Sequence, residues 1–182
     1  MPTLIYLIGF MGSGKSTLGS ILANVLGYDF MDLDDVLVRR FGRSIETVFA
    51  EDGEDVFRAA EQALIRESTM MEQTVISTGG GVFLFAENRS LMSQHGLTVY
   101  LRLPMSLLVD RLRSSRHRPL LYDDRGVTLK GAALETRIRR LLEEREPFYE
   151  MADLVIDVEP GSVGQTVDNL FKEIQAFANK PA

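Results

Sequence analysis

The chain alternates short apolar runs with longer stretches in which apolar residues recur every three or four positions. The short runs predict buried strands, and the three-to-four spacing predicts amphipathic helices. Strands that alternate with helices favour an α/β fold with a parallel sheet, in which ligands bind at the carboxyl ends of the strands. We expect five strands, at residues 4–8, 28–31, 74–78, 98–103 and 154–158. We expect helices at residues 16–26, 36–41, 54–71, 88–94, 105–112, 131–146 and 161–178, and a short helix capped by Ser44.

Proline and glycine mark two further features of this pattern. Pro147 is expected to end the helix that begins at Gly131, because proline lacks the N–H that a helix interior requires. Residues 114–130 are polar, contain Pro119 and Gly126, and show little periodicity, which predicts a mobile loop. We find no repeat, low-complexity tract or interdomain linker, so we expect the 182 residues to form one domain.

The segment after the first predicted strand carries a phosphate-binding motif. Residues 9–16 read Gly-Phe-Met-Gly-Ser-Gly-Lys-Ser and match G-x-x-x-x-G-K-[ST] at every required position. The glycines allow backbone amides to converge on phosphate oxygens, and the following helix N-terminus adds partial positive charge. Lys15 can then reach the β and γ phosphates, and the Ser16 hydroxyl can ligate magnesium. The motif predicts a nucleoside triphosphate site, against the alternative of a glycine-rich turn that binds nothing.

A GTPase switch is disfavoured by the absence of a guanine-reading segment. Such segments usually read Asn-Lys-x-Asp, and the aspartate is essential to them. In this chain Asn179-Lys180 is followed by Pro181-Ala182, so the required aspartate is missing. ATP is therefore the expected nucleotide.

Composition and charge exclude several other classes of protein. The formal net charge is -6, whereas nucleic-acid binders usually carry a basic excess, so nucleic acid is not an expected partner. The chain has no cysteine, which excludes disulfides and cysteine metal sites, and its two histidines are too few for a histidine metal cage. No apolar stretch approaches the ~20 residues of a membrane span, and the N-terminus lacks the basic region of a signal peptide. We therefore expect a cytoplasmic protein with no membrane partner.

Acidic residues and glycines follow two of the predicted strands. Asp32 and Asp34 end the second strand and would share a face if the chain stays extended. One carboxylate could hold magnesium and the other could accept a proton from a substrate hydroxyl, although solvated acidic turns are common. Gly79, Gly80 and Gly81 follow the third strand. They could bring a ligand close to backbone amides, or they could form a flexible turn.

Arginines supply candidates for anion binding. Arg58 and Arg145 lie on predicted helices, where a solvated surface position is the common alternative. A cluster of four arginines, Arg111, Arg113, Arg116 and Arg118, leads into Pro119-Leu120-Leu121 in the predicted loop. An arginine on such a loop could swing over the γ phosphate and offset charge during transfer, although a basic surface loop is the other interpretation.

Taken in order along the chain, these motifs resemble the shikimate kinase family. The resemblance covers essentially the whole chain, and each segment after the P-loop is weak alone, but six in order are specific. The segments are Leu-Ile-Gly-Phe-Met-Gly-Ser-Gly-Lys-Ser-Thr at residues 7–17, Asp32-Leu33-Asp34, Phe57-Arg58 with Glu61, Thr78-Gly79-Gly80-Gly81, Arg118-Pro119-Leu120-Leu121 and Arg145-Glu146-Pro147-Phe148-Tyr149.

The resemblance implies a three-layer α/β/α P-loop fold like that of nucleoside monophosphate kinases, with a central five-stranded parallel sheet. It implies a substrate-binding helical segment near residues 33–60 and a lid near residues 113–128. It also implies transfer of the γ phosphate of ATP to the 3-hydroxyl of shikimate, which gives shikimate 3-phosphate and ADP on the route to chorismate and aromatic amino acids. Mg²⁺ is the implied cofactor, and a monomer is expected.

The same resemblance implies roles for individual residues. Lys15, Asp34 and Arg118 would be catalytic, with Asp34 holding the reacting hydroxyl and Arg118 on the lid. Arg58 and Arg145 could bind the shikimate carboxylate through bidentate contacts. The implied ATP-binding residues are Gly12, Ser13, Gly14, Lys15, Ser16, Thr17, Arg111, Arg118 and Pro160, with Arg111 stacking on adenine. The implied shikimate-binding residues are Asp34, Arg58, Gly79, Gly80, Gly81 and Arg145, and the implied magnesium site comprises Ser16 and Asp32.

Two other functions stay open on the sequence. A kinase for gluconate or for a nucleoside monophosphate would share the P-loop, although the candidate carboxylate-binding arginines and the triple glycine favour shikimate. A nucleotide-binding regulator without catalysis is the second alternative. Against it stands the intact set of reactive residues, Lys15, Ser16, Asp32, Asp34 and Arg118.

Overall fold

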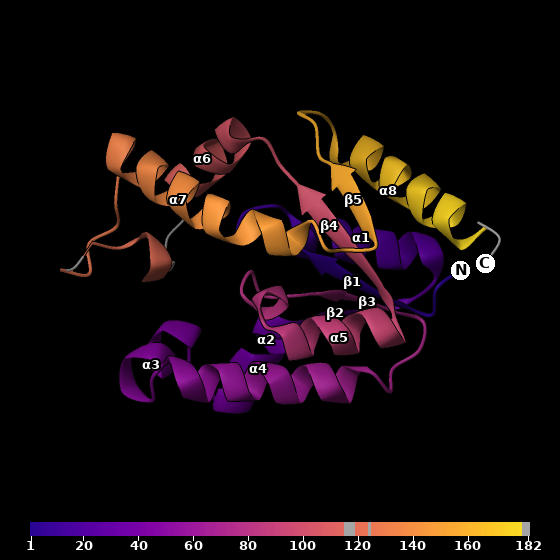
Figure 1. The fold of residues 1–182 in the computed structure, drawn as a ribbon, viewed down its shortest axis with the longest axis horizontal. Helices are drawn as coiled ribbons and strands as arrows, with labels where there is room; N and C mark the ends of the chain where they lie inside the picture. Colours follow the sequence, from indigo (N-terminus) through magenta and orange to yellow (C-terminus); the bar gives the residue numbers. More distant parts are fainter. Residues whose placement is uncertain (115–118, 124, 180–182) are drawn as a thin grey trace.

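The central sheet is all-parallel and has the strand order β2-β3-β1-β4-β5 (Figure 1). The structure is a computed structural model that describes residues 1–114, 119–123 and 125–179. Because β1 is the middle strand, the loop that follows it opens at the centre of the carboxyl edge, where ligands of such sheets bind. The strands are β1 (Leu4–Ile8), β2 (Asp29–Asp32), β3 (Thr74–Ser77), β4 (Leu97–Arg102) and β5 (Leu154–Asp157).

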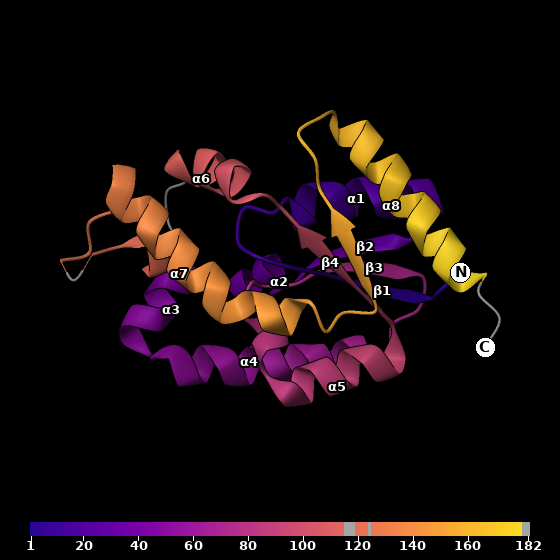
Figure 2. The same ribbon diagram turned by 45° about the horizontal axis from the view of Figure 1, so that its top comes forward.

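Helices cover both faces of the sheet, which confirms the predicted three-layer α/β/α architecture (Figures 1 and 2). α1 (Lys15–Leu26) and α8 (Val163–Ala178) pack together on one face, and α4 (Glu54–Ser68) and α5 (Ala86–His95) lie on the other. The remaining elements are α2 (Leu33–Phe41), α3 (Ile45–Glu51), α6 (Met105–Arg113), α7 (Gly131–Tyr149) and the 3-10 turns η1 (Val82–Leu84) and η2 (Pro119–Leu121). Among the residues that the structure describes, no helix has both the length and the apolar composition that crossing a membrane requires.

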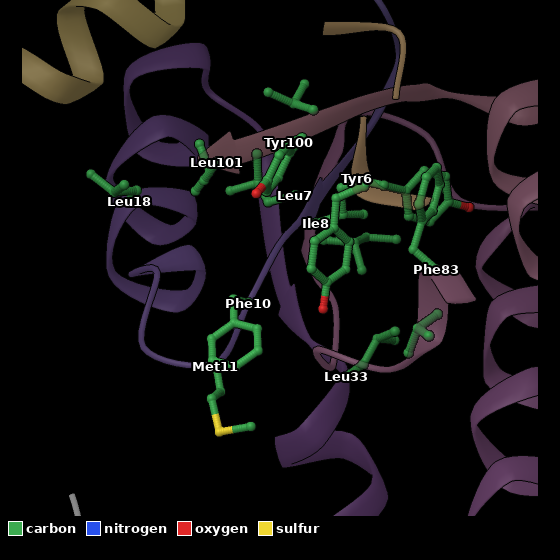
Figure 3. Close-up of a cluster of buried hydrophobic side chains, with 14 of the residues drawn as sticks. Tyr6, Leu7, Ile8, Phe10, Met11, Leu18, Leu33, Phe83, Tyr100 and Leu101 are labelled. Atoms are coloured by element: carbon green, nitrogen blue, oxygen red, sulfur yellow. The ribbon is translucent and has the colours of Figure 1, made fainter. Parts of the chain in front are cut away.

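The core forms around β1, which is buried along its whole length. A central parallel strand is covered on both faces, so its sequence is continuously apolar rather than alternating. Figure 3 shows this cluster, in which Leu7 of β1 lies near Leu101 of β4. The cluster continues past the end of β1 to Phe10 and Met11, which are 1% and 6% exposed. The apolar core therefore anchors one side of the phosphate-binding loop.

Helix α2 begins at Leu33 rather than at the predicted Val36, because Asp32 caps it. One carboxylate oxygen of Asp32 accepts hydrogen bonds from the backbone N–H groups of Asp34 at 3.0 Å and Asp35 at 3.5 Å. The expectation that Asp32 and Asp34 share a face of extended chain is therefore wrong. Asp32 ends β2, and Asp34 lies in the first turn of α2.

Pro147 does not end α7, contrary to the prediction, and the helix continues to Tyr149. Proline costs a helix most in its interior, where it removes a hydrogen bond and crowds the preceding turn. Pro147 lies in the last turn, and the helix still closes with a 2.9 Å bond from the N–H of Glu150 to the carbonyl of Glu146. The continuation matters for the site because residues four apart share a helix face, so Arg145 and Tyr149 project to the same side.

Two other predictions need smaller corrections. α4 ends at Ser68 rather than at Met71, in a turn closed by Thr69. The segment predicted as a mobile loop has local order in its described part, because η2 is followed by an antiparallel bridge between Tyr122 and Thr128. The Asp123 carboxylate supports this bridge by accepting backbone N–H bonds within the turn, including one of 2.9 Å from Val127.

Candidate active site

The loop between β1 and α1 is a tight turn that presents backbone N–H groups at the N-terminus of a helix. Gly9, Gly12 and Gly14 have φ angles of 138°, 78° and 94°, which residues with a side chain rarely adopt. Gly14 is also the residue that precedes the first helical residue, Lys15. A helix N-terminus built in this way favours anions, because its free N–H groups and the helix dipole point at the same place.

The Lys15 side chain folds back over this loop. Its ammonium group donates hydrogen bonds to the carbonyls of Gly9 at 2.9 Å and Phe10 at 3.0 Å, and it lies 3.4 Å from the hydroxyl of Ser13. Lys15 is only 8% exposed, so these bonds hold a positive charge at a defined place in the concave face of the loop. The arrangement suits a polyphosphate group, which is negatively charged and rich in acceptors.

Ser16 and Asp32 meet beside the phosphate-binding loop. The Ser16 hydroxyl donates to one carboxylate oxygen of Asp32 at 2.6 Å, and it lies 3.3 Å from the Ser77 hydroxyl. The other Asp32 oxygen caps α2, so this carboxylate has a fixed orientation. Hydroxyl and carboxylate oxygens are the ligands that Mg²⁺ accepts when substrate phosphates and water complete its shell. The residues therefore fit a magnesium ion that a bound nucleotide would share.

A cavity of about 450 Å³ opens over these groups. Its lining includes Arg111, whose guanidinium donates to the carbonyls of Gly12 and Ser13, each at 3.2 Å. Pro160 lies outside this lining and faces a neighbouring hollow between β5 and α8, although Glu159 and Gly161 on either side of it do line the cavity. The expected nucleotide-binding residues that line the cavity are Gly12, Gly14, Lys15, Ser16, Thr17 and Arg111.

A second cavity, of about 280 Å³, contains the predicted acceptor residues. Arg58 reaches it from α4 and Arg145 from α7, so two guanidinium groups face one space from different helices. Phe49 and Phe57 form an apolar wall, with ring centroids 4.9 Å apart. Cationic donors beside an apolar wall suit a small ligand that has a carboxylate and a hydrocarbon ring.

The triple glycine forms a wall of this cavity, and its lack of side chains has a steric reason. A Cβ atom on Gly79 would lie 2.8 Å from a carboxylate oxygen of Glu61 and 3.0 Å from one of Asp34. A Cβ atom on Gly81 would lie 2.7 Å from the guanidinium of Arg58. Side chains from α2 and α4 therefore approach this turn so closely that a Cβ atom on either glycine would displace them.

The two cavities share three residues. Met11 from the phosphate-binding loop, Asp34 from the first turn of α2 and Gly80 from the end of β3 line both spaces. A Cβ atom on Gly80 would lie 3.4 Å from the Met11 nitrogen, so the two loops are in close contact. Asp34 thus contributes a carboxylate at the boundary between the phosphate-binding cavity and the acceptor cavity.

Glu61 lines the second cavity, although the sequence placed it only in a family-like segment and not among the expected binding residues. It is 2% exposed, and Arg58 donates to it at 2.5 Å and to Glu54 at 2.9 Å. The guanidinium of Arg58 also lies 5.4 to 5.8 Å from the ring centroids of three phenylalanines, which are Phe49, Phe57 and Phe85. The spacing of Glu54, Arg58 and Glu61 on one helix face is a signal for ion pairing. Nothing in that spacing showed that the face is buried.

Burial raises the pKa of Glu61 to about 7 from an ordinary value of 4.5, and the neighbouring Arg58 offsets only part of this effect. Since the pKa is higher in the folded protein, the protonated carboxyl stabilises the fold fully below pH 4.5, and this contribution is lost as the pH rises through about 7. We therefore expect the stability of the wild type relative to Glu61→Gln to fall by roughly 1–3 kcal/mol between pH 5 and pH 8. Urea unfolding of both proteins at several pH values measures this difference. Parallel pH profiles would contradict it.

Comparison with known proteins agrees with this geometry. The family model described as Shikimate kinase matches residues 11–175. The shikimate kinase of Chlorobium chlorochromatii (strain CaD3) is 43% identical to this chain over 176 residues, which cover 97% of the chain and 93% of that relative. This chain belongs to the shikimate kinase family.

Solved structures extend the comparison. The structure of shikimate kinase from Acinetobacter baumannii in complex with shikimate has a TM-score of 0.87 and 34% identity, and the match covers 98% of this chain and 96% of that one. A gluconokinase from Sinorhizobium meliloti 1021 matches with a TM-score of 0.58 at 18% identity, over 98% of each chain, which shows a shared fold alone. The fold is therefore common to several kinases, whereas the sequence similarity is to shikimate kinases.

The shikimate kinase resemblance inferred from sequence is confirmed at the level of the family, and most of the residues it implied lie around the two joined cavities. Ser13, Asp32 and Pro160 line neither of these two cavities. Arg118 cannot be placed, because residues 115–118 lie outside the described residues, as does part of the predicted lid at residues 113–128. From the described part of that lid, Leu120 of η2 lines the second cavity.

Proposed function

We propose that this protein transfers the γ phosphate of ATP to the 3-hydroxyl of shikimate, giving shikimate 3-phosphate and ADP for aromatic amino acid biosynthesis. The observation that carries the proposal is the shared boundary of the two cavities at Met11, Asp34 and Gly80. Phosphoryl transfer requires little covalent chemistry from a protein, so its rate depends on how well donor and acceptor are positioned and how well charge is stabilised.

The donor half is the phosphate-binding loop with α1. The backbone amides and the Lys15 ammonium would hold the terminal phosphates, and they would stabilise charge that develops during transfer. Ser16 and Asp32 would hold a Mg²⁺ ion, which supplies further neutralisation of the phosphate charge when bound. Arg111 is tied to the loop carbonyls beside the nucleotide cavity, and its planar guanidinium could stack on adenine.

The acceptor half is the second cavity, to which the segment at residues 33–60 contributes Asp34, Phe49 and Arg58. Arg58 and Arg145 would bind the shikimate carboxylate, and the glycine turn would approach the ring closely because it has no side chains. With the carboxylate held in this way, a ring hydroxyl would extend toward the boundary with the donor cavity. Asp34 at that boundary would orient the hydroxyl and accept its proton as the oxygen attacks phosphorus.

Acceptor-dependent release of ADP tests the proposal against the other kinases of this fold. With ATP and Mg²⁺, we expect ADP release on addition of shikimate, and little release on addition of gluconate or adenosine monophosphate. Shikimate that lacks the 3-hydroxyl is the matched control, because it has the same carboxylate and ring. Turnover with gluconate and none with shikimate would refute the proposal, and ATP binding without any phosphorylated acceptor would favour a regulator.

The remaining expectations stay predictions. They are a monomeric enzyme that works in the cytoplasm, a single kinase domain over residues 1–182, and a lid at residues 113–128 that carries Arg118. Closure of such a lid would exclude water and so limit hydrolysis of ATP.

A further inference from the structure

A buried tyrosine joins the last turn of α7 to the glycine turn. Tyr149 has no exposed surface, and its hydroxyl donates a 2.5 Å hydrogen bond to the carbonyl oxygen of Gly80, which is 69 residues away in sequence. Neither the donor half nor the acceptor half described above uses this hydroxyl. The position of Gly80 matters, however, because it lines both cavities.

The Gly80 carbonyl differs from its neighbours in where its hydrogen bond comes from. The carbonyl of Gly79 accepts from the N–H of Val82 at 3.3 Å, and that of Gly81 accepts from the N–H of Leu84 at 3.1 Å. Both of those bonds are local and would form wherever this turn lies. The bond from Tyr149 is long-range, so it fixes the turn relative to α7. Since a peptide unit is planar, holding the Gly80 carbonyl also fixes the direction of the next N–H group.

The same hydroxyl interacts with Arg145, one helical turn earlier. Burial raises the pKa of Tyr149 to about 12, while the charge of Arg145 and a side-chain hydrogen bond from it act in the opposite direction. The hydroxyl therefore stays protonated at neutral pH and remains a donor. A tyrosine hydroxyl can donate one hydrogen bond and accept others, so donation to Gly80 leaves the Tyr149 hydroxyl able to accept from Arg145, which lies one turn earlier on the same face of α7.

We propose that Tyr149 is a positioning residue for the acceptor, which sets the Arg145 guanidinium and the Gly80 peptide at a fixed distance and orientation. This inference rests on the proposed function, in which both groups bind shikimate. Glycine has the widest conformational freedom of any residue, so a run of three would otherwise leave this wall of the cavity poorly defined. The chemistry required of residue 149 is a buried hydroxyl, not only an aromatic ring.

A second contact, which does not involve the Tyr149 hydroxyl, links α7 to η1, directly after the glycine turn. Arg89 donates to the carbonyls of Phe83 at 2.9 Å and Leu84 at 2.7 Å, and its guanidinium lies 5.1 Å from the centre of the Phe148 ring. Arg89 of α5 therefore joins η1 to the end of α7. Removal of the Tyr149 hydroxyl alone should therefore loosen Gly80 and Arg145 without separating α7 from the sheet.

The test is Tyr149→Phe, which keeps the buried ring and removes the hydroxyl. We expect KM for shikimate to rise about 10-fold, because the Gly80 carbonyl and the Arg145 guanidinium lose a buried partner. We expect kcat to stay within about three-fold and KM for ATP within about two-fold, because the phosphate-binding loop is unchanged. Tyr100→Phe is the matched control. Tyr100 is also a buried tyrosine, its ring lies 5.2 Å from that of Tyr149, and its hydroxyl contacts Glu146 at 3.4 Å.

The outcomes separate this inference from the proposed function. Absence of shikimate-dependent turnover in the wild type would refute the function itself. The positioning role would be overturned if the wild type is active and Tyr149→Phe leaves the shikimate KM unchanged. An equal rise of the KM values for shikimate and ATP, or an equal effect of Tyr100→Phe, would also overturn it.

If Tyr149→Phe is partly unfolded at the assay temperature, calorimetric titration of the folded variant at low temperature replaces the kinetics. Weaker binding of shikimate with unchanged binding of ADP would support the role, and equal loss of both would overturn it.

Discussion

Replacement of Asp34 by asparagine should lower kcat about 10³-fold, within the range of about 10² to 10⁴ that a positioned general base contributes. Asparagine keeps the shape of the side chain but removes the negative charge and the ability to take a proton. The reacting hydroxyl would therefore lose its acceptor at the boundary of the two cavities. The dissociation constant for ATP should stay within about two-fold, because the loop amides and Lys15 remain. Steady-state kinetics together with equilibrium titration of the nucleotide measure both quantities.

Asp35→Asn is the matched control for this prediction. Asp35 is the next residue in the same helical turn, it is exposed, and it is not among the residues that line either cavity. Its replacement changes the charge of α2 by the same amount, so it reports any general effect on the helix. Full activity of Asp34→Asn would remove Asp34 from the mechanism. A similar loss in Asp35→Asn would mean that the helix, rather than the carboxylate at the boundary, is responsible.

Lys15→Ala should reduce kcat/KM by about 10³-fold or more, because removal of one preorganised donor to a developing charge already costs about 10² to 10³. In the folded chain the Lys15 ammonium is held by the carbonyls of Gly9 and Phe10, so the charge is in place before a nucleotide arrives. Without it, charge on the transferring phosphoryl group would be left uncompensated at this position. The loss should appear with saturating shikimate, since the acceptor cavity is unchanged.

Lys172→Ala provides the control for removal of a positive charge, because Lys172 is an exposed lysine of α8. A near-normal rate in Lys15→Ala would overturn the assignment of the phosphate-binding loop. Circular dichroism and thermal unfolding of the variant are needed beside the kinetics, since two loop carbonyls lose their hydrogen-bond donor. A variant with native-like unfolding and no transfer is the expected result.

The positions of the strands were predictable from sequence to within two residues at each end. β1, β3 and β4 are buried along nearly their whole length, so their sequences are rich in apolar and β-branched residues. The boundaries that were wrong have local causes. The cap formed by Asp32 starts α2 early, and the position of Pro147 in a last turn allows α7 to continue. A pattern of apolar residues does not report either effect.

Arg145 shows where prediction from residue type and spacing reaches its limit. Arg139, Arg140 and Arg145 lie on one Glu/Arg-rich helix, and their spacing does not distinguish them. In the structure, the side chains of Arg139 and Arg140 are 56% and 74% exposed and pair with glutamates of their own helix. Arg145 is 9% exposed and lies against the glycine turn. The direction in which α7 packs decides which arginine enters the acceptor cavity.

The sequence by itself determined the phosphate-binding half of the site, because that half is contiguous. Residues 9–16 form the loop, and the strand and helix that adjoin it in sequence carry its amides and Lys15. Only the tertiary structure decided the acceptor half, because its groups come from α2, α4, the end of β3 and α7. Such groups meet through long-range packing, and the role proposed for the hydroxyl of Tyr149, which donates to the Gly80 carbonyl beside Arg145, is recognisable only once that packing is known.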